Sequence, residues 1–336
     1  MSFKRFDSED LVISAESITG PVWTNNITTL TTFYTSSVQE NSTPGTFYLD
    51  VYQTGSTLDE AEVQFSIAYC DKKGSGSVLF NSSIENASPS SVNYGTFRTL
   101  VLGDEEADVT FSGVSSEYFY AIVFDRARYK EKLLPGTLQL RLDYNGTTLI
   151  LSDNSTSLTS LTFTDAGRVY DLIGKIGTVE FKESSDLFRD SGSYGKLLPD
   201  IGVILLNGNA LDADPGIGGL GLGIVRTSNA DDQNPRKLYN AMVSGIGFKM
   251  NYEETITSNF VFVRARNSEF NYSSNPSYLT GSGELRYPLL IDDPRSYITT
   301  VGMYNDNNDL LAVAKLSRPL LKDSRKEALI RVKLDF

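Results

Sequence analysis

Apolar and polar residues alternate in short runs along most of this chain. Every second residue is apolar in the runs 63–69 and 138–144. Because successive side chains of a strand point to opposite faces of a sheet, this alternation is typical of strands with one buried face. Clusters of Gly, Asn, Asp and Ser separate the runs. The pattern predicts a mainly β fold with two or three domains of the β-sandwich or barrel type.

Three places between alternating runs favour β-hairpins. Asn145-Gly146 suits a two-residue turn because both of its residues tolerate positive φ. The same turn chemistry predicts hairpins at Asn207-Gly208, after the run 203–206, and at Asp306-Asn307-Asn308, between the runs 297–304 and 310–316.

One segment departs from the alternation and predicts one short helix, at about residues 235–244. Asn234 can cap its start and Pro235 suits its first turn, while Gly245 provides a left-handed stop. The apolar residues at helical spacing are Leu238, Ala241 and Met242.

The chain divides into four predicted regions. They are an extended N-terminal arm (1–20), a β domain (21–145), a β-rich domain that holds the short helix (146–260) and a C-terminal β domain (261–336). The arm carries Phe3 and Phe6 among charged residues, and we expect it either to hang free or to wrap a partner.

The C-terminal residues alternate up to the last position, where a free end normally frays. Their apolar members are Ala328, Ile330, Val332, Leu334 and Phe336. The favoured interpretation is the final strand of the chain's own domain, and the alternative is strand addition to a neighbouring subunit.

Composition limits the function classes. The formal net charge of −12 argues against nucleic acid and anionic lipid as partners. Histidine is absent, which removes the commonest general base and the usual metal ligand. We interpret Cys70, the only cysteine, as a buried thiol and not as a nucleophile. The first ten residues do not resemble a signal peptide and no run is long enough to span a bilayer, so we expect a protein that folds in a cytosol, without a membrane and without a cofactor.

Three kinds of segment could carry chemistry, and each is interpreted as an ordinary turn or loop. The glycine-rich run 216–223 lacks the Lys-Ser/Thr of a phosphate loop. Adjacent acidic pairs such as Asp231-Asp232 do not form the separated carboxylates of a glycosidase. The turn 305–309 offers oxygen ligands for Ca²⁺, but without the spacing of an EF-hand.

A basic cluster stands out in this acidic chain. It consists of Arg126, Arg128, Lys130 and Lys132. A local positive patch attracts subunits that are themselves acidic, so we favour an intersubunit contact over an ordinary solvated face.

Several segments resemble virion structural proteins of T4-like myoviruses, including those that infect marine cyanobacteria. The segments are 131–136, 191–200, 264–272, 297–306, 310–319 and 330–336. A smaller similarity, at Val301–Tyr304 and Leu311–Ala314, is to a strand pair in tail-fibre and baseplate proteins of contractile phages. The resemblance implies a non-enzymatic structural component of the virion, in the tail or baseplate. Its implied partners are other tail or baseplate proteins and further copies of itself, after synthesis in the host cytoplasm.

Other readings stay open. A carbohydrate-binding receptor or adhesin module of the tail would also be acidic and rich in β structure, and a glycan-degrading enzyme needs only a pair of carboxylates about 5–10 Å apart. A position at the neck or elsewhere between head and tail is a further alternative. For the structural role, the predicted interaction residues are Phe3, Phe6, Arg126, Arg128, Lys130, Lys132, Ile330, Val332, Leu334 and Phe336.

Overall fold

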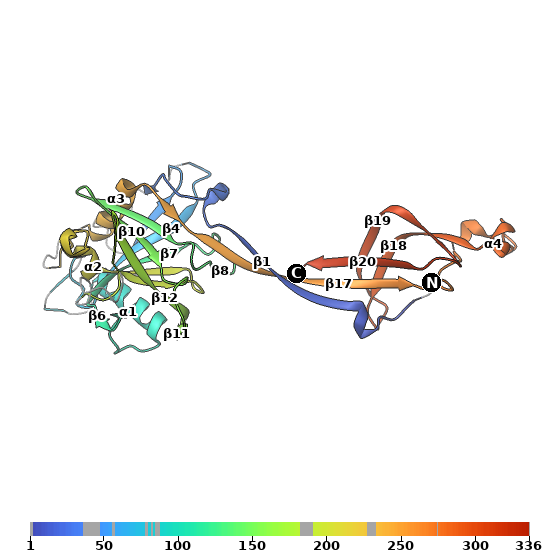
Figure 1. Ribbon diagram of the computed structural model, residues 1–336, viewed down its shortest axis with the longest axis horizontal. Coiled ribbons are helices and arrows are strands. Elements are labelled where there is room, and N and C mark those ends of the chain that lie inside the picture. Colours follow the sequence, from blue (N-terminus) through green and yellow to red (C-terminus); the bar gives the residue numbers. More distant parts are fainter. Residues whose placement is uncertain are drawn as a thin grey trace. The chain divides into compact units, whose positions relative to one another are not determined.

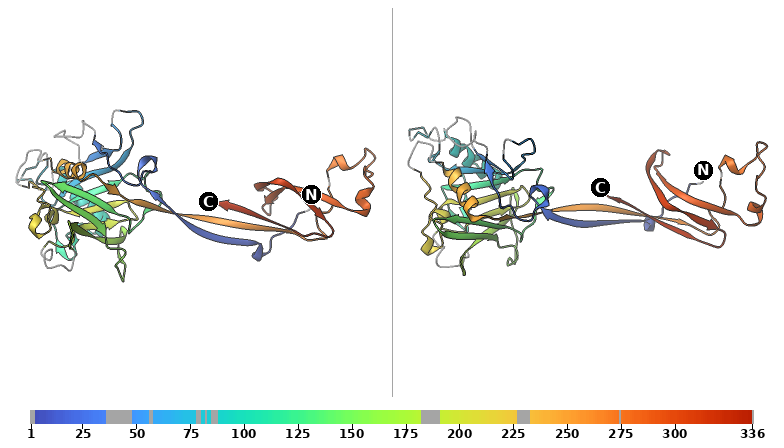
Figure 2. Two further views of the ribbon diagram at one scale, coloured as in Figure 1. Left: turned by 45° about the horizontal axis from the view of Figure 1, so that its top comes forward. Right: turned by 90° about the horizontal axis from the view of Figure 1, so that it is seen from above.

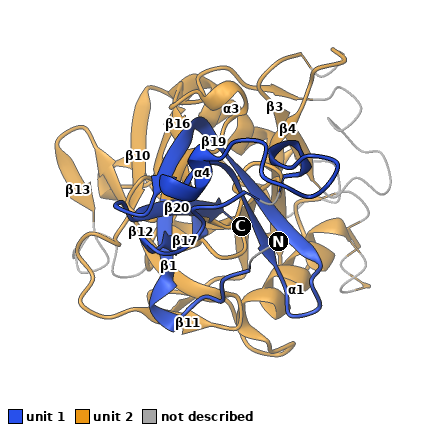
Figure 3. Ribbon diagram, turned by 90° about the vertical axis from the view of Figure 1, so that its right-hand side faces the viewer, with its two compact units in different colours: residues 1–17, 255–336 blue, residues 18–254 orange. Residues whose placement is uncertain are grey.

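The computed structural model describes residues 3–35, 48–55, 58–77, 80–81, 83–84, 88–181, 191–226, 233–273 and 275–335 (Figure 1, Figure 2). Strand accounts for 44% and helix for 16% of the structure, which confirms the mainly β prediction. The chain folds into two compact units (Figure 3). Unit 1 comprises residues 1–17 and 255–336, and unit 2 comprises residues 18–254.

Unit 2 is built on one large antiparallel sheet, which has twelve strands among the described residues. Their order is β16 (Phe248–Lys249), β9 (Gln139–Tyr144), β10 (Thr147–Asp153), β12 (Gly167–Ile176), β14 (Gly195–Leu198), β15 (Val203–Asn207), β7 (Tyr118–Phe124), β4 (Val63–Asp71), β3 (Leu49–Tyr52) and β2 (Tyr34–Thr35), while β11 (Thr162–Thr164) and β13 (Val179–Phe181) both pair with β12. A separate small ribbon joins β5 (Thr110–Phe111) to β6 (Val114–Ser115).

The central strands of this sheet are buried on both faces. In β4, Phe65, Ile67 and Tyr69 enter one core cluster, whereas Ala68 and Cys70 enter the other. The helix α3 (Asn234–Gly245) contributes to the first cluster and α1 (Pro89–Leu102) to the second, so the two helices cover opposite faces of the sheet (Figure 1). Cys70 is fully buried, as predicted, and burial raises the pKa of its thiol well above the ordinary value.

An aromatic cluster closes the sheet on itself. Phe65 on β4 and Phe248 on β16 stand far apart in the strand order, yet their ring centroids are 5.4 Å apart. Trp23 lies 4.9 Å from Phe248 and 5.7 Å from Phe124 on β7. A bridge between Leu30 and Phe248 brings the segment after Trp23 to the same edge. The sheet is therefore strongly curled, with the larger core cluster inside it (Figure 2).

The helix predicted at residues 235–244 is confirmed as α3, but the expectation of a single helix is wrong. The described residues also form α1, α2 (Gly208–Asp212), α4 (Leu289–Asp292) and the 3₁₀ turns Ser8–Asp10, Thr24–Asn26, Pro215–Ile217 and Pro276–Tyr278. Helix α1 is rich in Ser, Thr, Asn and Gly, which are weak helix formers. Its boundaries nevertheless carry signals, because Pro89 opens it and Gly103 ends it with a left-handed φ of 64°.

Two of the three predicted hairpins are confirmed. Asn145 and Gly146 have φ values of 49° and 80° and join β9 to β10, and the turn 306–308 joins β18 (Arg295–Tyr304) to β19 (Leu310–Asp323). The prediction of a hairpin at Asn207-Gly208 is wrong. Asn207 instead caps α2, where its side chain accepts a hydrogen bond from the backbone N–H of Asn209.

The unit boundaries differ from the predicted domains. The predicted break at 145 falls in the turn of the β9–β10 hairpin, within one sheet, and the predicted break at 260 falls inside β17 (Asn251–Ala265), six residues after the boundary of unit 2. Short turns do not separate domains when the strands on either side pair with each other. The proposed arm is also largely structured, because its residues from Leu11 onward form β1 (Leu11–Pro21).

Unit 1 contains the ends of the chain. Its strands form a sheet of order β1, β17 and β20 (Ala328–Asp335) and the β18–β19 hairpin. The first part of β17 belongs to unit 2, where Tyr252 and Glu253 pair with β8 (Lys132–Leu133). Ala265 pairs with Ala328 and Ser258 with Asp335, so the predicted C-terminal strand is confirmed as a strand of the chain's own sheet.

Replacing Phe248 tests the closure of the curled sheet. The Phe248→Ala substitution removes a fully buried ring that joins the edge strand β16 to Phe65 on β4, and it should lower the free energy of unfolding by about 3–5 kcal/mol. Denaturant titration followed by the fluorescence of Trp23, the only tryptophan, measures this change. The control Phe163→Ala removes a ring that is 66% exposed and should shift the value by no more than about 0.5 kcal/mol. Equal effects of the two substitutions would contradict the closure.

Candidate interaction surfaces

The two units differ greatly in how much apolar surface they bury. Among the described residues, the core clusters of unit 2 contain 36 and 14 buried residues, whereas the cluster of unit 1 contains four. Those four are Val261, Met303, Ile330 and Val332. Unit 1 spans 17 residues at the start and 82 at the end of the chain, so it is poorly supplied with core for its size.

Unit 1 also exposes large apolar side chains. It holds 15 of the 29 large apolar side chains that are exposed among the described residues, in less than a third of the chain. Prominent examples are Ile13 on β1, Tyr297 on β18, and Leu311 and Val313 on β19. Scattered exposed apolar residues are normal on soluble proteins, but this density along strands is typical of surfaces that contact another molecule.

The strand β1 is exposed on both of its faces. All of its first nine residues are exposed, including Leu11, Val12 and Ile13. Because neighbouring residues of a strand point to opposite sides, neither face of β1 is covered by the described part of the chain. In the sequence, the uninterrupted apolar triplet Leu11–Ile13 is the signal for this exposed strand. The prediction of an extended arm did not take it into account.

The C-terminal strand directs its predicted interaction residues inward. Ile330 and Val332 are buried in the core of unit 1, and Leu334 packs against that core. Phe336 lies outside the described residues. The outward face of β20 carries Arg331 and Lys333, whose charged groups lie 5.6 and 5.9 Å from the centre of the Phe260 ring. The outward face of β20 therefore combines these two cations with the exposed Leu329.

The residues before β1 contact unit 1 of the same chain. Lys4 Nζ donates to the backbone oxygen of Arg264 at 2.6 Å and pairs with Glu269 at 3.1 Å. The ring of Phe3 meets that of Tyr304 edge to face at 5.3 Å, although both Phe3 and Phe6 stay largely exposed. This segment is therefore attached to its own unit and does not hang free.

The basic cluster is partly neutralised within unit 2. Arg128 pairs with Glu62 at 2.8 Å and Lys132 pairs with Glu253 at 3.3 Å. The guanidinium of Arg126 lies 4.6 Å from the centre of the Tyr129 ring, and Lys130 is exposed in a turn with a φ of 54°. The four cations thus do not act as one positive patch, because two of them already face a carboxylate.

Among the described residues of unit 1, Lys322 is the one buried cation. Lys322 is fully buried, and its Nζ donates to the backbone oxygens of Asn267 and Asp323 at 3.1 and 2.9 Å and to Asn271 Oδ1 at 2.7 Å. Three acceptors satisfy the three donors of an ammonium group. Lys322 therefore attaches the loop after β17 to the end of β19.

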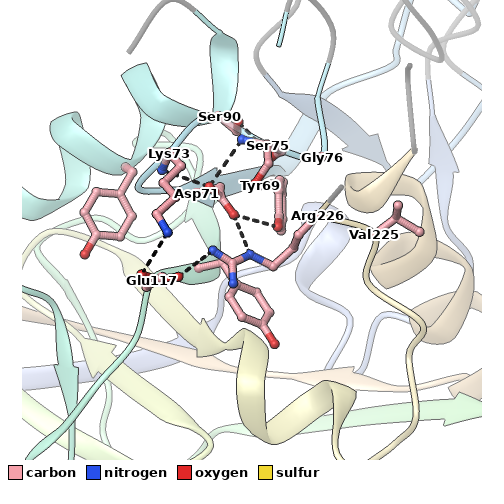
Figure 4. Close-up of polar contacts among 12 residues, drawn as sticks. Tyr69, Asp71, Lys73, Ser75, Gly76, Ser90, Glu117, Val225 and Arg226 are labelled. Atoms are coloured by element: carbon pink, nitrogen blue, oxygen red, sulfur yellow. Dashed lines mark hydrogen bonds and ion pairs between the residues drawn. The ribbon is translucent and has the colours of Figure 1, made fainter. Parts of the chain in front are cut away.

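A buried polar cluster of unit 2 surrounds Asp71, at the end of β4 (Figure 4). The Asp71 side chain is 0% exposed, and it accepts hydrogen bonds from Arg226 Nε at 2.7 Å and from the backbone N–H groups of Lys73 and Ser75 at 2.9 and 3.2 Å. Charge-assisted hydrogen bonds of this kind offset the desolvation of a buried carboxylate.

Arg226 joins Asp71 to a second carboxylate. It donates to Glu117 at 2.9 Å, and its guanidinium lies 4.3 Å from the centre of the Tyr118 ring. Hydrogen bonding to Arg226 lowers the pKa of Glu117. Burial works to lower the pKa of Arg226, but its bonds to Asp71 and Glu117 outweigh burial and raise it.

Asn234 continues this network into the start of α3. It donates to the backbone oxygens of Gly76 and Val225 at 3.0 and 2.9 Å and accepts from the Val225 N–H at 3.2 Å. The cluster thus ties together the turn after β4, the segment before α3 and the helix itself. A general acid needs a raised pKa, and Glu117 has the opposite, so the arrangement suits a structural role.

A hollow of about 500 Å³ lies beside α1 and is lined by Lys72, Lys73, Tyr94, Arg98 and Glu117 among others. Lys72 pairs with Asp108 at 2.5 Å and Lys73 with Glu117 at 3.6 Å. Two of its three cations therefore already have anionic partners, which weakens it as an anion site.

The remaining sequence candidates are structural. The glycine-rich run places Leu220 and Leu222 in the core of unit 2, and Gly218 accepts a hydrogen bond from the Tyr194 hydroxyl at 2.7 Å. In the turn 305–309, Asn305 Oδ1 accepts from the backbone N–H groups of Asn307 and Asp309. Where the structure is described, no three Cys, Asp or Glu side chains gather to hold a metal ion, and no helix is long and apolar enough to cross a membrane.

Comparison with known proteins adds no relative. No protein family, no curated protein and no solved structure matches the chain.

Removing Arg226 tests the structural role of the Asp71 cluster. The Arg226→Met substitution leaves a fully buried carboxylate without its cation, and it should lower the free energy of unfolding by about 3 kcal/mol. The control Lys175→Met removes an exposed cation from β12 and should change the value by no more than about 0.5 kcal/mol. Stability of Arg226→Met equal to that of the unaltered chain would show that the ion pair has no structural importance.

Glu117 should contribute a pH-dependent part of this stability. Its pKa is lower in the folded chain than in the unfolded chain, so its contribution is complete above the unfolded value of about 4.3 and is lost as the pH falls through the lower folded value. The unaltered chain should therefore melt at a higher temperature than Glu117→Gln at neutral pH, and the two should converge only as the pH falls below the lowered folded pKa of Glu117. Thermal unfolding recorded across this range measures the difference, and a constant difference at all pH values would contradict the assignment.

Proposed function

We propose that this chain is a structural component of a contractile-tailed bacteriophage virion, in the tail or baseplate, and that unit 1 is the part that joins it to other subunits. The observation that carries the proposal is the exposed apolar surface of unit 1 beside its four-residue core. The placement in a phage particle rests on the sequence resemblance.

The energetics of unit 1 support an assembly role. Covering half of a leucine or isoleucine side chain contributes roughly 1 kcal/mol of hydrophobic free energy. Leu311, Val313 and Tyr297 are all more than half exposed and lie on one hairpin. A partner that covers this hairpin supplies the apolar contacts that unit 1 lacks, so binding and the ordering of unit 1 reinforce each other.

The distribution of charge supports the same division of roles. Unit 1 contains 13 basic and 13 acidic residues, whereas unit 2 contains 17 basic and 29 acidic residues and so accounts for the whole net charge of −12. When many copies gather, the negative net charge of each unit 2 repels that of the others. Copies of unit 1 have no net charge and lack this repulsion. Contacts between closely spaced subunits therefore meet the least electrostatic repulsion when they are made through unit 1.

Analysis of purified particles tests the proposal. Mass spectrometry of gradient-purified particles of the phage that encodes this chain should detect it at a fixed ratio to a major tail protein. The Leu311→Asp variant should be incorporated at less than about a tenth of the normal level, because a buried carboxylate at an apolar contact costs more than 1.4 kcal/mol.

The matched control for this experiment is Phe163→Asp, at a side chain of unit 2 with nearly the same exposure, 66% against 69% for Leu311. This control should be incorporated normally. Absence of the chain from purified particles would refute the proposal, and equal incorporation of both variants would refute the role of unit 1.

A further inference from the structure

The edge of the unit 1 sheet suggests which molecule covers it. In the strand order β1, β17, β20, the strand β1 is an outer strand. An edge strand presents backbone N–H and C=O groups along one side, and these groups can pair with a strand of another chain.

The edge formed by β1 lacks the features that normally prevent pairing. Natural edge strands carry lysines, prolines or bulges that discourage association. In residues 11–17 the single charged residue is Glu16, and proline occurs only at the far end of β1, at Pro21. The side chains of Leu11, Val12 and Ile13 are exposed at 46%, 47% and 66%.

We infer that β1 pairs with β1 of a second copy of this chain, antiparallel, in a symmetric contact. The inference rests on the proposed function, since it names the partner of unit 1 in the assembly. Two identical strands related by a twofold axis always present the same pattern to each other, so the contact is self-complementary.

The residues of β1 suit this pairing. With the axis near Ser14, Ile13 of one copy faces Ala15 of the other, and Val12 faces Glu16. Two Glu16 side chains are then not directly opposite, so the like-charge repulsion of facing carboxylates is avoided. Unit 1 is electrically neutral in total, whereas unit 2 carries the net charge that opposes close association of its copies.

Sedimentation velocity of the full chain tests the inference. The unaltered chain should sediment as an oligomer of the 37.0 kDa protomer. Ile13→Lys places a charge on the edge strand and should weaken association at least about tenfold. The control Phe163→Lys, at an equally exposed position of unit 2, should associate as the unaltered chain does. Circular dichroism and Trp23 fluorescence verify that both variants are folded.

Cysteine cross-linking locates the contact independently. Because the only native cysteine, Cys70, is buried, a disulfide dimer formed under mild oxidation reports an introduced thiol. Cysteines placed singly at Ile13, Ser14 and Ala15 should give a cross-linked dimer for at least one position. Ser160→Cys, at an exposed position of unit 2, should give little dimer.

A monomeric unaltered chain would overturn the inference, as would an oligomer that Ile13→Lys leaves intact and that no β1 cysteine cross-links. These results are separable from the test of the proposed function. A chain that is monomeric in isolation but present in purified particles leaves the virion role standing, with another virion protein on β1. A chain that dimerises through β1 but is absent from particles supports the contact and refutes the virion role.

Discussion

The unequal burial of apolar surface is the constraint on which the behaviour of this protein depends. Unit 2 closes a curled sheet around a large core, and the rings of Trp23, Phe65 and Phe248 join the edge strand β16 to β4 across its inside. Unit 1 has no comparable core and leaves long strands exposed. Because hydrophobic burial is the main favourable contribution to folding, unit 1 gains most from contact with another molecule.

The net charge is divided between the two units as unequally as the buried apolar surface. The net charge of unit 2 keeps copies of it hydrated and apart, while its interior is held by apolar packing and by the fully partnered Asp71–Arg226 pair. In unit 1, Lys322 attaches a loop to β19, and the cations of β20 cover the Phe260 ring. Charge thus stabilises each unit locally, and the exposed apolar strands are left for association.

Local patterns predicted much of the fold. The alternation in β4, β9 and β20, the turn at Asn145-Gly146 and the signals around α3 all act within a few residues, so the sequence alone reveals them. The start of α2 was missed because Asn207-Gly208 suits both a turn and a helix cap, and only the pairing of β15 on both sides decides between them. The weak helix formers of α1 concealed that helix.

The candidate surfaces could not be predicted from the sequence, because they depend on contacts between residues that are far apart along the chain. Residues Ile330 and Val332 look like a free apolar face until β17 and the β18–β19 hairpin are known to cover them. Asp71 and Arg226 are 155 positions apart, so no spacing rule joins them. Conversely, the exposure of Leu11–Ile13 is visible only once β1 is placed at the edge of a sheet.

Hydrogen exchange of the β1 backbone tests most directly whether unit 1 is completed by another molecule. Exchange followed by mass spectrometry would compare peptides from residues 11–17 and from α3, in the dilute chain and in the assembled state. The account predicts that exchange in residues 11–17 slows strongly on assembly while exchange in α3 stays the same. Equally fast exchange of residues 11–17 in both states would contradict it, because an edge strand that pairs with a neighbour protects its amides.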